Sequence, residues 1–247
     1  MKINDGKAVT MHSMNPGRVR LADLPRWVEP NDLLAQGGAE AFQFEKEDFE
    51  HIALLDPEEG TLFVVGKLIT GDRGKLTTLL GRCTSLILEV DQDPRLVSHL
   101  GEWTMKKIFV FTRPSARGEP VDAFPNVGFL DQEGLRNATL EPAFRNELRE
   151  ALSHSPVSAT FIDGRPVAFC YAASQSHRFW DVSIDTLPDH RRKGYARQCA
   201  LHMMQFMETQ GKQVVWQSFE DNPPSWKLAQ SLGLIPTDQL LYLEKQA

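Results

Sequence analysis

The sequence has little cysteine and no long apolar run. Its three cysteines, Cys83, Cys170 and Cys199, lie far apart, and none forms a C-x-x-C pair. This spacing argues against a disulfide framework and against a cysteine zinc site. No apolar run approaches the about 20 residues that a spanning helix needs, and the polar N-terminus lacks the apolar region of a signal peptide. We therefore expect a cytoplasmic protein with no membrane partner and no metal.

Positive charge is also scarce. The 247 residues include 27 lysine and arginine residues against 33 aspartate and glutamate residues, for a formal net charge of −6. A net acidic chain is a poor default for nucleic-acid binding, so no nucleic-acid partner is expected. Hydrophobic residues make up 41% and charged residues 24%, and these ordinary fractions exclude a disordered or fibrous chain. A globular protein of one large domain or two ordinary ones remains.

A change in composition indicates where the chain divides. Residues 113–120 hold two prolines and a glycine, and they follow a strand-like run. Such clusters are typical of linkers, because proline fixes φ and glycine frees it. We therefore predict an N-terminal accessory domain over 1–112, a linker over 113–120 and a C-terminal domain over 121–247.

The N-terminal part is predicted to be mixed α and β. Its apolar spacing favours helices over 39–52 and 93–103 and strands over 62–65 and 85–90. No residues in this part have the spacing of a known chemistry.

The C-terminal part has a clearer pattern, which predicts an α/β fold. Its elements follow the order α, β, β, β, α, β, α, β and are expected at 142–153, 157–162, 165–171, 179–186, 194–209, 213–219, 225–232 and 239–244. The Asp163-Gly164 pair between the first two strands predicts a hairpin, because a type I′ turn needs positive φ.

The segment 185–196 carries the most informative chemistry. A strand ends there, the basic triplet Arg191-Arg192-Lys193 follows, and a helix begins at Gly194. Free N–H groups and the helix dipole at such a junction favour an anion, and glycine lets the backbone approach it closely. These residues fit a pyrophosphate cradle. A solvated basic turn that caps a helix fits them too, and both interpretations stay open at this point.

Two motifs give this part of the chain a family resemblance. Arg191-x-x-Gly194-x-Ala196 resembles the R/Q-x-x-G-x-G/A pattern of the GNAT superfamily of acyl-CoA N-acyltransferases. Residues 222–234 resemble that family's N-x-x-S-x-x-L/A-x-x-x-L-G-F segment, and the predicted hairpin resembles its second and third strands. The resemblance covers residues 121–247. It implies a mixed, mostly antiparallel sheet with one splayed parallel strand pair, flanked by helices.

The resemblance also implies acetyl-CoA as the co-substrate and a primary amine as the acceptor. The coenzyme would lie where the strands 179–186 and 213–219 splay apart, and the amine would attack the thioester directly. The residues expected to contact the coenzyme are Ile184, Asp185, Thr186, Arg191, Arg192, Lys193, Gly194, Tyr195, Ala196, Asn222 and Ser225. The N-terminal domain offers strands and helices without this loop, which suggests a degenerate copy of the same fold.

The catalytic candidates are Asp185, Asp181 and Ser225. The two aspartates stand four residues apart on one predicted strand, so they share a face, and either could be the general base. The alternative interpretation makes them surface carboxylates that pair with Arg178 or Arg191. Ser225 could protonate the departing thiolate.

One position departs from the family pattern. Many members carry a tyrosine four residues after the motif serine, and this chain has Ala229 there. A non-catalytic acyl-CoA-binding or sensor module is therefore the alternative to an enzyme. The acceptor stays open between a small-molecule and a peptide amine. The apolar residues Leu240, Leu241 and Leu243 could form an edge strand for a homodimer or simply close the sheet.

Overall fold

The computed structural model describes residues 11–45, 48, 50–69, 72–92, 103–114 and 124–246. They fall into two compact units. The first unit draws its residues from 1–22, 30–109 and 238–247, and the second from 23–29 and 110–237. Strands β6 (Trp103–Thr112) and β12 (Ile235–Lys245) contribute residues to both.

The predicted linker lies almost wholly outside the described residues. Only residues 113 and 114 of it are described. The predicted helix over 93–103 also lies outside, apart from Trp103, which begins β6. The predicted division into domains therefore stays a prediction.

The first unit is built on a small mixed sheet. Its elements are β1 (His12–Met14), η1 (Pro16–Arg18), most of α1 (Val28–Gln36), β2 (Glu40–Gln43), β3 (Ile52–Asp56), β4 (Thr61–Val65), α2 (Arg73–Leu80) and β5 (Ser85–Glu89). Strands β1 to β4 pair antiparallel in chain order, β5 joins β4 in parallel, and the end of β12 pairs antiparallel with β5. The strands expected over 62–65 and 85–90 are present.

The helix predicted over 39–52 is wrong. Its described residues instead include β2, and β3 begins at its last residue, Ile52. Residues 41–44 are all buried, and β2 pairs with β1 on one edge and β3 on the other. Strand pairing and burial outweigh the helical spacing of the local sequence, as is common for short apolar runs.

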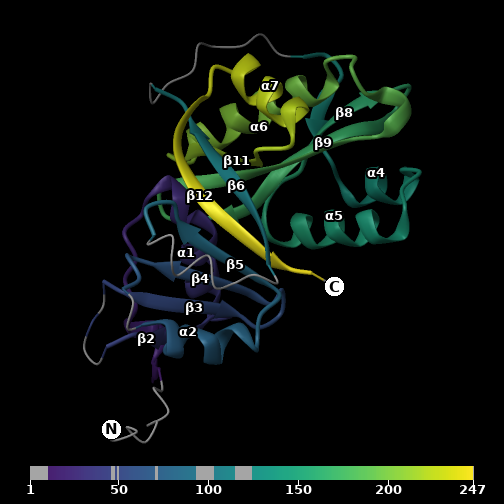
Figure 1. Cartoon of the computed structure of the whole chain (residues 1–247). Helices are drawn as coiled ribbons and strands as arrows, with labels where there is room; N and C mark the ends of the chain where they lie inside the picture. Colours follow the sequence, from purple (N-terminus) through teal and green to yellow (C-terminus); the bar gives the residue numbers. More distant parts are fainter. Residues whose placement is uncertain are drawn as a thin grey trace, which may run out of the picture. The chain divides into compact units, whose positions relative to one another are not determined.

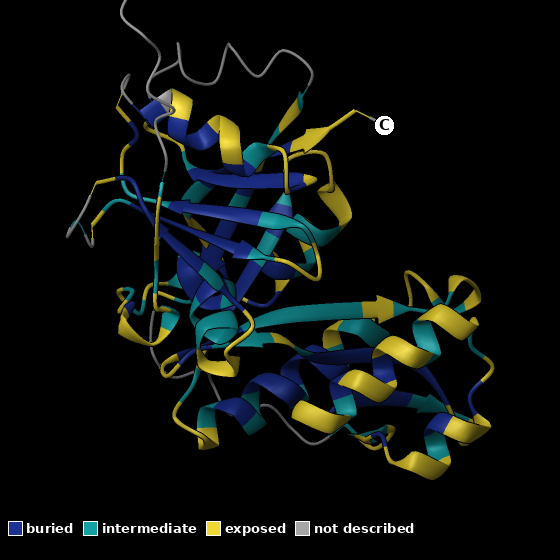
Figure 2. Cartoon of the chain, turned by 90° about the horizontal axis from the view of Figure 1, so that it is seen from below, coloured by how far each residue is buried: buried dark blue, intermediate teal, exposed yellow. Residues whose placement is uncertain are grey.

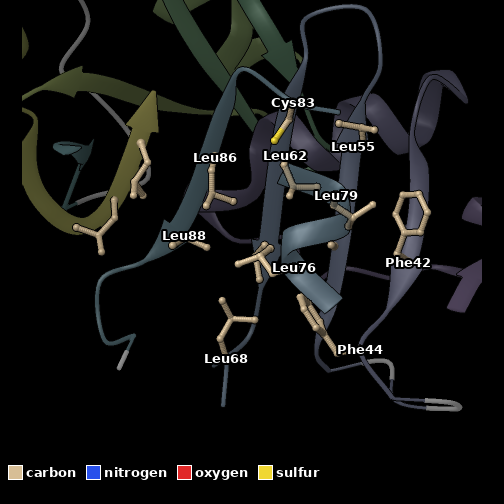
Figure 3. Packing of buried hydrophobic residues seen from close by; sticks show 14 residues of the cluster. Phe42, Phe44, Leu55, Leu62, Leu68, Leu76, Leu79, Cys83, Leu86 and Leu88 are labelled. Atoms are coloured by element: carbon tan, nitrogen blue, oxygen red, sulfur yellow. The ribbon is translucent and has the colours of Figure 1, made fainter. Parts of the chain in front are cut away.

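The core of the first unit lies between α2 and the sheet. Figure 3 shows Leu76 and Leu79 of α2 directed at the strands, among Leu62, Leu86 and Leu88. These five side chains are at most 5% exposed. The apolar face of α2 therefore fixes this helix on the sheet.

The second unit holds the segment with the predicted chemistry. Its elements are η2 (Pro25–Trp27), β7 (Val127–Phe129), α4 (Gln132–Asn137), α5 (Pro142–His154), β8 (Ser158–Ile162), β9 (Arg165–Gln175), β10 (Phe179–Thr186), η4 (Pro188–His190), α6 (Tyr195–Thr209), β11 (Gln213–Phe219) and α7 (Pro223–Ser231). The strand order is β7-β8-β9-β10-β11. Only β10 and β11 in this set pair in parallel.

Helices cover both faces of this sheet. Figure 1 shows α4 and α5 on one side of β8 and β9, and α6 and α7 on the other. Phe169 and Tyr171 of β9 pack with α4 and α5, while the intervening Cys170 lies close to Cys199 of α6. The two cysteines are fully buried, and burial raises the pKa of each thiol, so both are core residues. In Figure 2 the strands are dark blue and teal, and the helices are yellow on their outer sides.

The predicted hairpin is present. Asp163 and Gly164 have φ values of +49° and +76°, the positive pair that a type I′ turn needs. Strand β9 then pairs with β10 along its length, with one irregularity between Asp181 and Val182 of β10. This irregularity lies where β10 also parts from β11.

The two units share an order of elements. The first has β2, β3, β4, α2 and β5, and the second has β8, β9, β10, α6 and β11. In each, three antiparallel strands lead through a helix to a strand parallel with the third.

None of the described helices is long and apolar enough to cross a membrane.

Candidate functional site

The site begins where β10 and β11 separate. Their parallel pairing runs from Phe179 and Gln213 to Asp181 and Val215. Beyond that point β10 continues to Thr186 and β11 to Phe219 without pairing to each other. Backbone groups on this edge of β10 are thus left without a partner from β11, as the predicted splay requires.

Asp181 sits at the point of separation. Its carboxylate accepts hydrogen bonds from the N–H of Val182 at 3.0 Å and from the backbone and side chain of Gln217. Burial, and then the nearby charge of Glu29, raise the pKa of Asp181 to about 7 despite these bonds. The carboxylate therefore bonds to both strands where they separate, and its pKa lies near neutral pH.

The basic loop turns sharply between β10 and α6. Arg192 and Gly194 have φ values of +60° and +82°, and α6 begins at Tyr195. A side-chain carbon at Gly194 would meet no atom within 4 Å, so glycine serves the backbone conformation and leaves open space beside it. The first N–H groups of α6 have no partner within the helix. The loop therefore offers free donors at an unobstructed helix start.

Positive charge surrounds this helix start. Residues 191–194 are exposed. The Nε of Arg191 donates to the carbonyl of Thr186 at 3.1 Å, and Nζ of Lys193 donates to that of Asp189 at 2.9 Å. Each side chain keeps further donors for a ligand. Free N–H groups, the helix dipole and these cations together make an anion site suited to a pyrophosphate.

A cavity of about 640 Å³ opens beside the end of β10. It is lined by the turn between α4 and α5, the start of β9, and residues 185–191. Phe144 gives it an apolar wall, and its charged lining includes Glu141 and Arg165. Both the volume and the mixed lining suit a small polar ligand.

Asp185 lines this cavity. The residue is exposed on one side, and its carboxyl group is partly buried. This burial and the negative charge of Glu147 raise the pKa of Asp185, and the positive charge of Arg191 lowers it. His190 lines the same cavity, and its buried Nδ1 has no hydrogen-bond partner. The cavity thus brings a carboxylate of raised pKa and an imidazole side chain to one wall.

The second motif forms the start of α7. Asn222 caps this helix, its Oδ1 accepting from the N–H of Ser225 at 3.3 Å. The hydroxyl of Ser225 accepts from Nε1 of the buried Trp216 at 2.8 Å. Ala229 is fully buried. The motif therefore has a structural role in this chain, whatever contact it makes with a ligand.

The structure separates the predicted residues into three places. Residues 184–186 and 191–196 are consecutive parts of the β10 end and its loop. Asn222 and Ser225 belong to the start of α7, and Asp181 lies at the point of strand separation. Of the three catalytic candidates, only Asp185 lines the cavity. Roles for all of these residues stay predictions.

Four residues that act on the site were not predicted from the sequence. Glu29 and Gln217 act on Asp181, and Glu147 and Tyr171 lie beside Asp185. Tyr171 alternates with Phe169 on β9, a signal that places both on one face. The other three come from distant elements, and no local pattern indicates them.

In the first unit, the described residues of the corresponding loop bond to a side chain of the unit itself. Strands β4 and β5 stay paired up to Val64 and Leu88. Beyond them the amide of Gln92 accepts from the N–H of Leu68 at 2.8 Å and donates to the carbonyl of Gly66 at 3.2 Å. Side chains of the unit itself therefore use the groups that a ligand would need.

A family comparison agrees with this geometry. Residues 158–240 match the family model for GNAT acetyltransferase. The resemblance of the C-terminal part to the GNAT superfamily is confirmed. The matched residues run from β8 into β12 and include the splayed strands, the basic loop and α7. A comparison with curated protein sequences gives no match.

Solved structures with the GNAT architecture resemble the chain more widely. A GCN5-related N-acetyltransferase-like protein from Streptococcus suis is 15% identical, with a TM-score of 0.60 over 86% of this chain and 90% of that one. An acetyltransferase of the GNAT family from Colwellia psychrerythraea is 10% identical, with a TM-score of 0.56 over 84% and 86%. A tandem GNAT protein from the clavulanic acid biosynthesis pathway is 13% identical, with a TM-score of 0.55 over 88% and 93%.

At these identities the likeness concerns the fold. The predicted fold class is confirmed, with a mixed, mostly antiparallel sheet, a splayed parallel pair, flanking helices and an N-terminal α/β part. Among the described residues, no group of three or more histidine, cysteine, aspartate or glutamate side chains is arranged to hold a metal ion.

Proposed function

We propose that this protein is an N-acetyltransferase that moves the acetyl group of acetyl-CoA directly to a primary amine. The observation that carries the proposal is the separation of β10 from β11 after Asp181, with a basic positive-φ loop at the end of the longer strand. A slot between strands and an anion site at its end fit a long thioester with a pyrophosphate.

The chain has suitable groups for each part of this co-substrate. The N–H groups and cations of residues 191–196 would hold the pyrophosphate, and the open space beside Gly194 admits it. The backbone groups of residues 184–186 on the edge of β10 that β11 leaves open would hold the pantetheine arm and polarise the thioester carbonyl. Asn222 and Ser225 would line its other side.

Asp185 is the proposed general base. The amine nitrogen bonds to the thioester carbon, the carbon–sulfur bond breaks, and the amine gives up a proton. Asp185 is best placed to take this proton, because it lines the cavity and its pKa is raised toward the working range of a base. Asp181 is the second candidate, although its carboxylate already accepts bonds from Val182 and Gln217.

Ser225 is the proposed proton donor to the departing thiolate. Its hydroxyl oxygen accepts from Trp216, which leaves the hydroxyl proton free to be donated. A thiolate can also leave without a proton, so this step contributes less to the rate than the base does.

A specific observation favours a second candidate function. Ala229 occupies the position of the tyrosine that many GNAT members carry, and it is fully buried with no hydroxyl to offer. A module that binds acyl-CoA without turnover is therefore the alternative.

We also propose that the first unit is a degenerate copy of the GNAT fold. Its element order, its parallel β4 and β5, and the likeness of the whole chain to a tandem GNAT protein support this. Its strands do not splay, and Gln92 occupies the loop, so this unit would not bind the coenzyme.

Calorimetric titration of acetyl-CoA into the full chain tests the proposal first. One site per chain is expected. Thiol release from bound acetyl-CoA is then followed across a panel of primary amines. Release that depends on an amine supports the enzyme, binding without release supports the sensor, and absence of binding refutes both.

A further inference from the structure

A buried tyrosine holds a glutamate close to the proposed base. Tyr171 of β9 is 4% exposed, and its hydroxyl donates to the carboxylate of Glu147 on α5. The hydroxyl of Ser183, which stands opposite Tyr171 in the sheet, hydrogen-bonds to it as well. An exposed glutamate on a helix would otherwise extend into water. This one is tied down onto the sheet.

The tie brings Glu147 next to Asp185. Asp185 follows Ser183 by two residues on β10, so the two side chains share a face, the one that α5 covers. Glu147 follows Phe144 of the cavity wall by three residues and so lies about one helical turn further along α5. Two carboxylates from separate elements thus face the same region.

Arg191 is the cation that acts on Asp185. It opposes the effect of Glu147 on the pKa of Asp185. The other charged or titratable groups on the cavity wall are Glu141, Arg165, Asp189 and His190. If Arg191 is drawn to a pyrophosphate, as the proposed function requires, Asp185 loses the opposing effect of this cation when the coenzyme binds.

We propose that Glu147, held by Tyr171, is a positioning residue that acts on acyl transfer through Asp185. The inference rests on the proposed function. Glu147 keeps a negative charge beside Asp185, which makes Asp185 a stronger base, and the loss of Arg191 to the coenzyme strengthens the effect. The proton itself passes from the amine nitrogen to the carboxylate of Asp185. Glu147 takes no proton and touches no reacting atom.

The test compares Glu147→Gln and Tyr171→Phe with the wild-type chain. Both variants remove the charge from the neighbourhood of Asp185, the first by neutralising it and the second by releasing it. Glu150→Gln is the matched control, because Glu150 is exposed on the same helix and does not act on Asp185. Thermal unfolding confirms that each variant is folded.

The readout is the pH dependence of kcat/KM for an amine that the wild-type chain acetylates. Removing the charge of Glu147 lowers the pKa of Asp185, so the acid limb moves to lower pH in both variants and stays in place in Glu150→Gln. A limb that stays in place in Glu147→Gln overturns the inference, since a merely structural role would leave it unmoved.

A second measurement separates this inference from the proposed function. The side-chain carboxyl of Asp185 is titrated by carbon-13 NMR in the free protein, with and without Glu147→Gln. A lower titration midpoint in the variant supports the coupling of the two carboxylates, whether or not an amine is turned over. Absence of turnover would refute acyl transfer and leave the coupling intact. An unchanged midpoint overturns the inference whether or not the protein is an enzyme.

Discussion

Gly194→Asp tests the basic loop as the coenzyme site. The substitution puts a side chain into the open space beside the start of α6 and adds a negative charge where we place a pyrophosphate. It also forces a non-glycine residue to a φ of +82°. Gly211→Asp is the matched control. Gly211 follows the other end of α6, has a φ of +74°, and likewise has no atom within 4 Å of an added side-chain carbon.

The expected effect on binding follows from the charges. An aspartate about 5 Å from two phosphate charges, at an effective dielectric constant of about 40, is repelled by about 3 kcal/mol. This corresponds to a loss of about 100-fold in affinity. The strain of positive φ costs each variant about 1–2 kcal/mol of unfolding free energy. The two variants should therefore lose similar stability and differ sharply in affinity.

Calorimetric titration of acetyl-CoA measures the affinities, and urea unfolding measures the stabilities. We expect binding of acetyl-CoA to be lost or greatly weakened in Gly194→Asp and nearly unchanged in Gly211→Asp. Equal affinity in the two variants would refute the reasoning, because it would mean that the loop does not hold the coenzyme.

Three further predictions concern the proposed catalytic residues. Asp185→Asn should lower kcat by about 100-fold or more while acetyl-CoA affinity changes little, as removal of a general base does; steady-state kinetics beside calorimetry checks this, and an unchanged kcat excludes Asp185 as the base. Asp181 has a folded-state pKa raised from 3.8 to about 7, so the folded chain holds more protons than the unfolded chain between these values, and stability falls as pH rises through this window. Asp181→Asn should flatten that fall in urea unfolding, and an equal slope in both proteins would contradict the assignment. Ser225→Ala should cost about 1–3 kcal/mol of unfolding free energy, because it leaves the buried indole N–H of Trp216 without its acceptor; the loss should shrink in a Trp216→Phe background, and an equal loss in both backgrounds would show that the bond contributes nothing.

The local pattern was sufficient to predict the helices and strands of the chain from α5 to β12. Alternating apolar residues and the Asp163-Gly164 turn lie within single strands and a single hairpin, so neighbours in sequence decide them. The short α4 and β7 were missed, since three to six residues are too few to show a period. The helix predicted over 39–52 was wrong for another reason, because pairing of β2 with two other strands decides the conformation there.

The site was predictable only in part. The basic loop is one continuous segment, so its glycine and its cations could be identified in the sequence. The difference between Asp181 and Asp185 could not be predicted, because it depends on Gln217, Glu29 and Glu147 from other elements. Likewise, the role of Ser225 as the acceptor for Trp216 depends on how α7 packs on β11.

The central claim is direct acyl transfer to an amine, and it is tested by measuring both products in one reaction. The full chain is incubated with acetyl-CoA and a panel of primary amines, and free thiol and N-acetyl amide are quantified together. We expect equal amounts of the two for at least one amine, and loss of both products in Gly194→Asp. Thiol release without amide, or bound acetyl-CoA that persists unchanged with every amine, would contradict it.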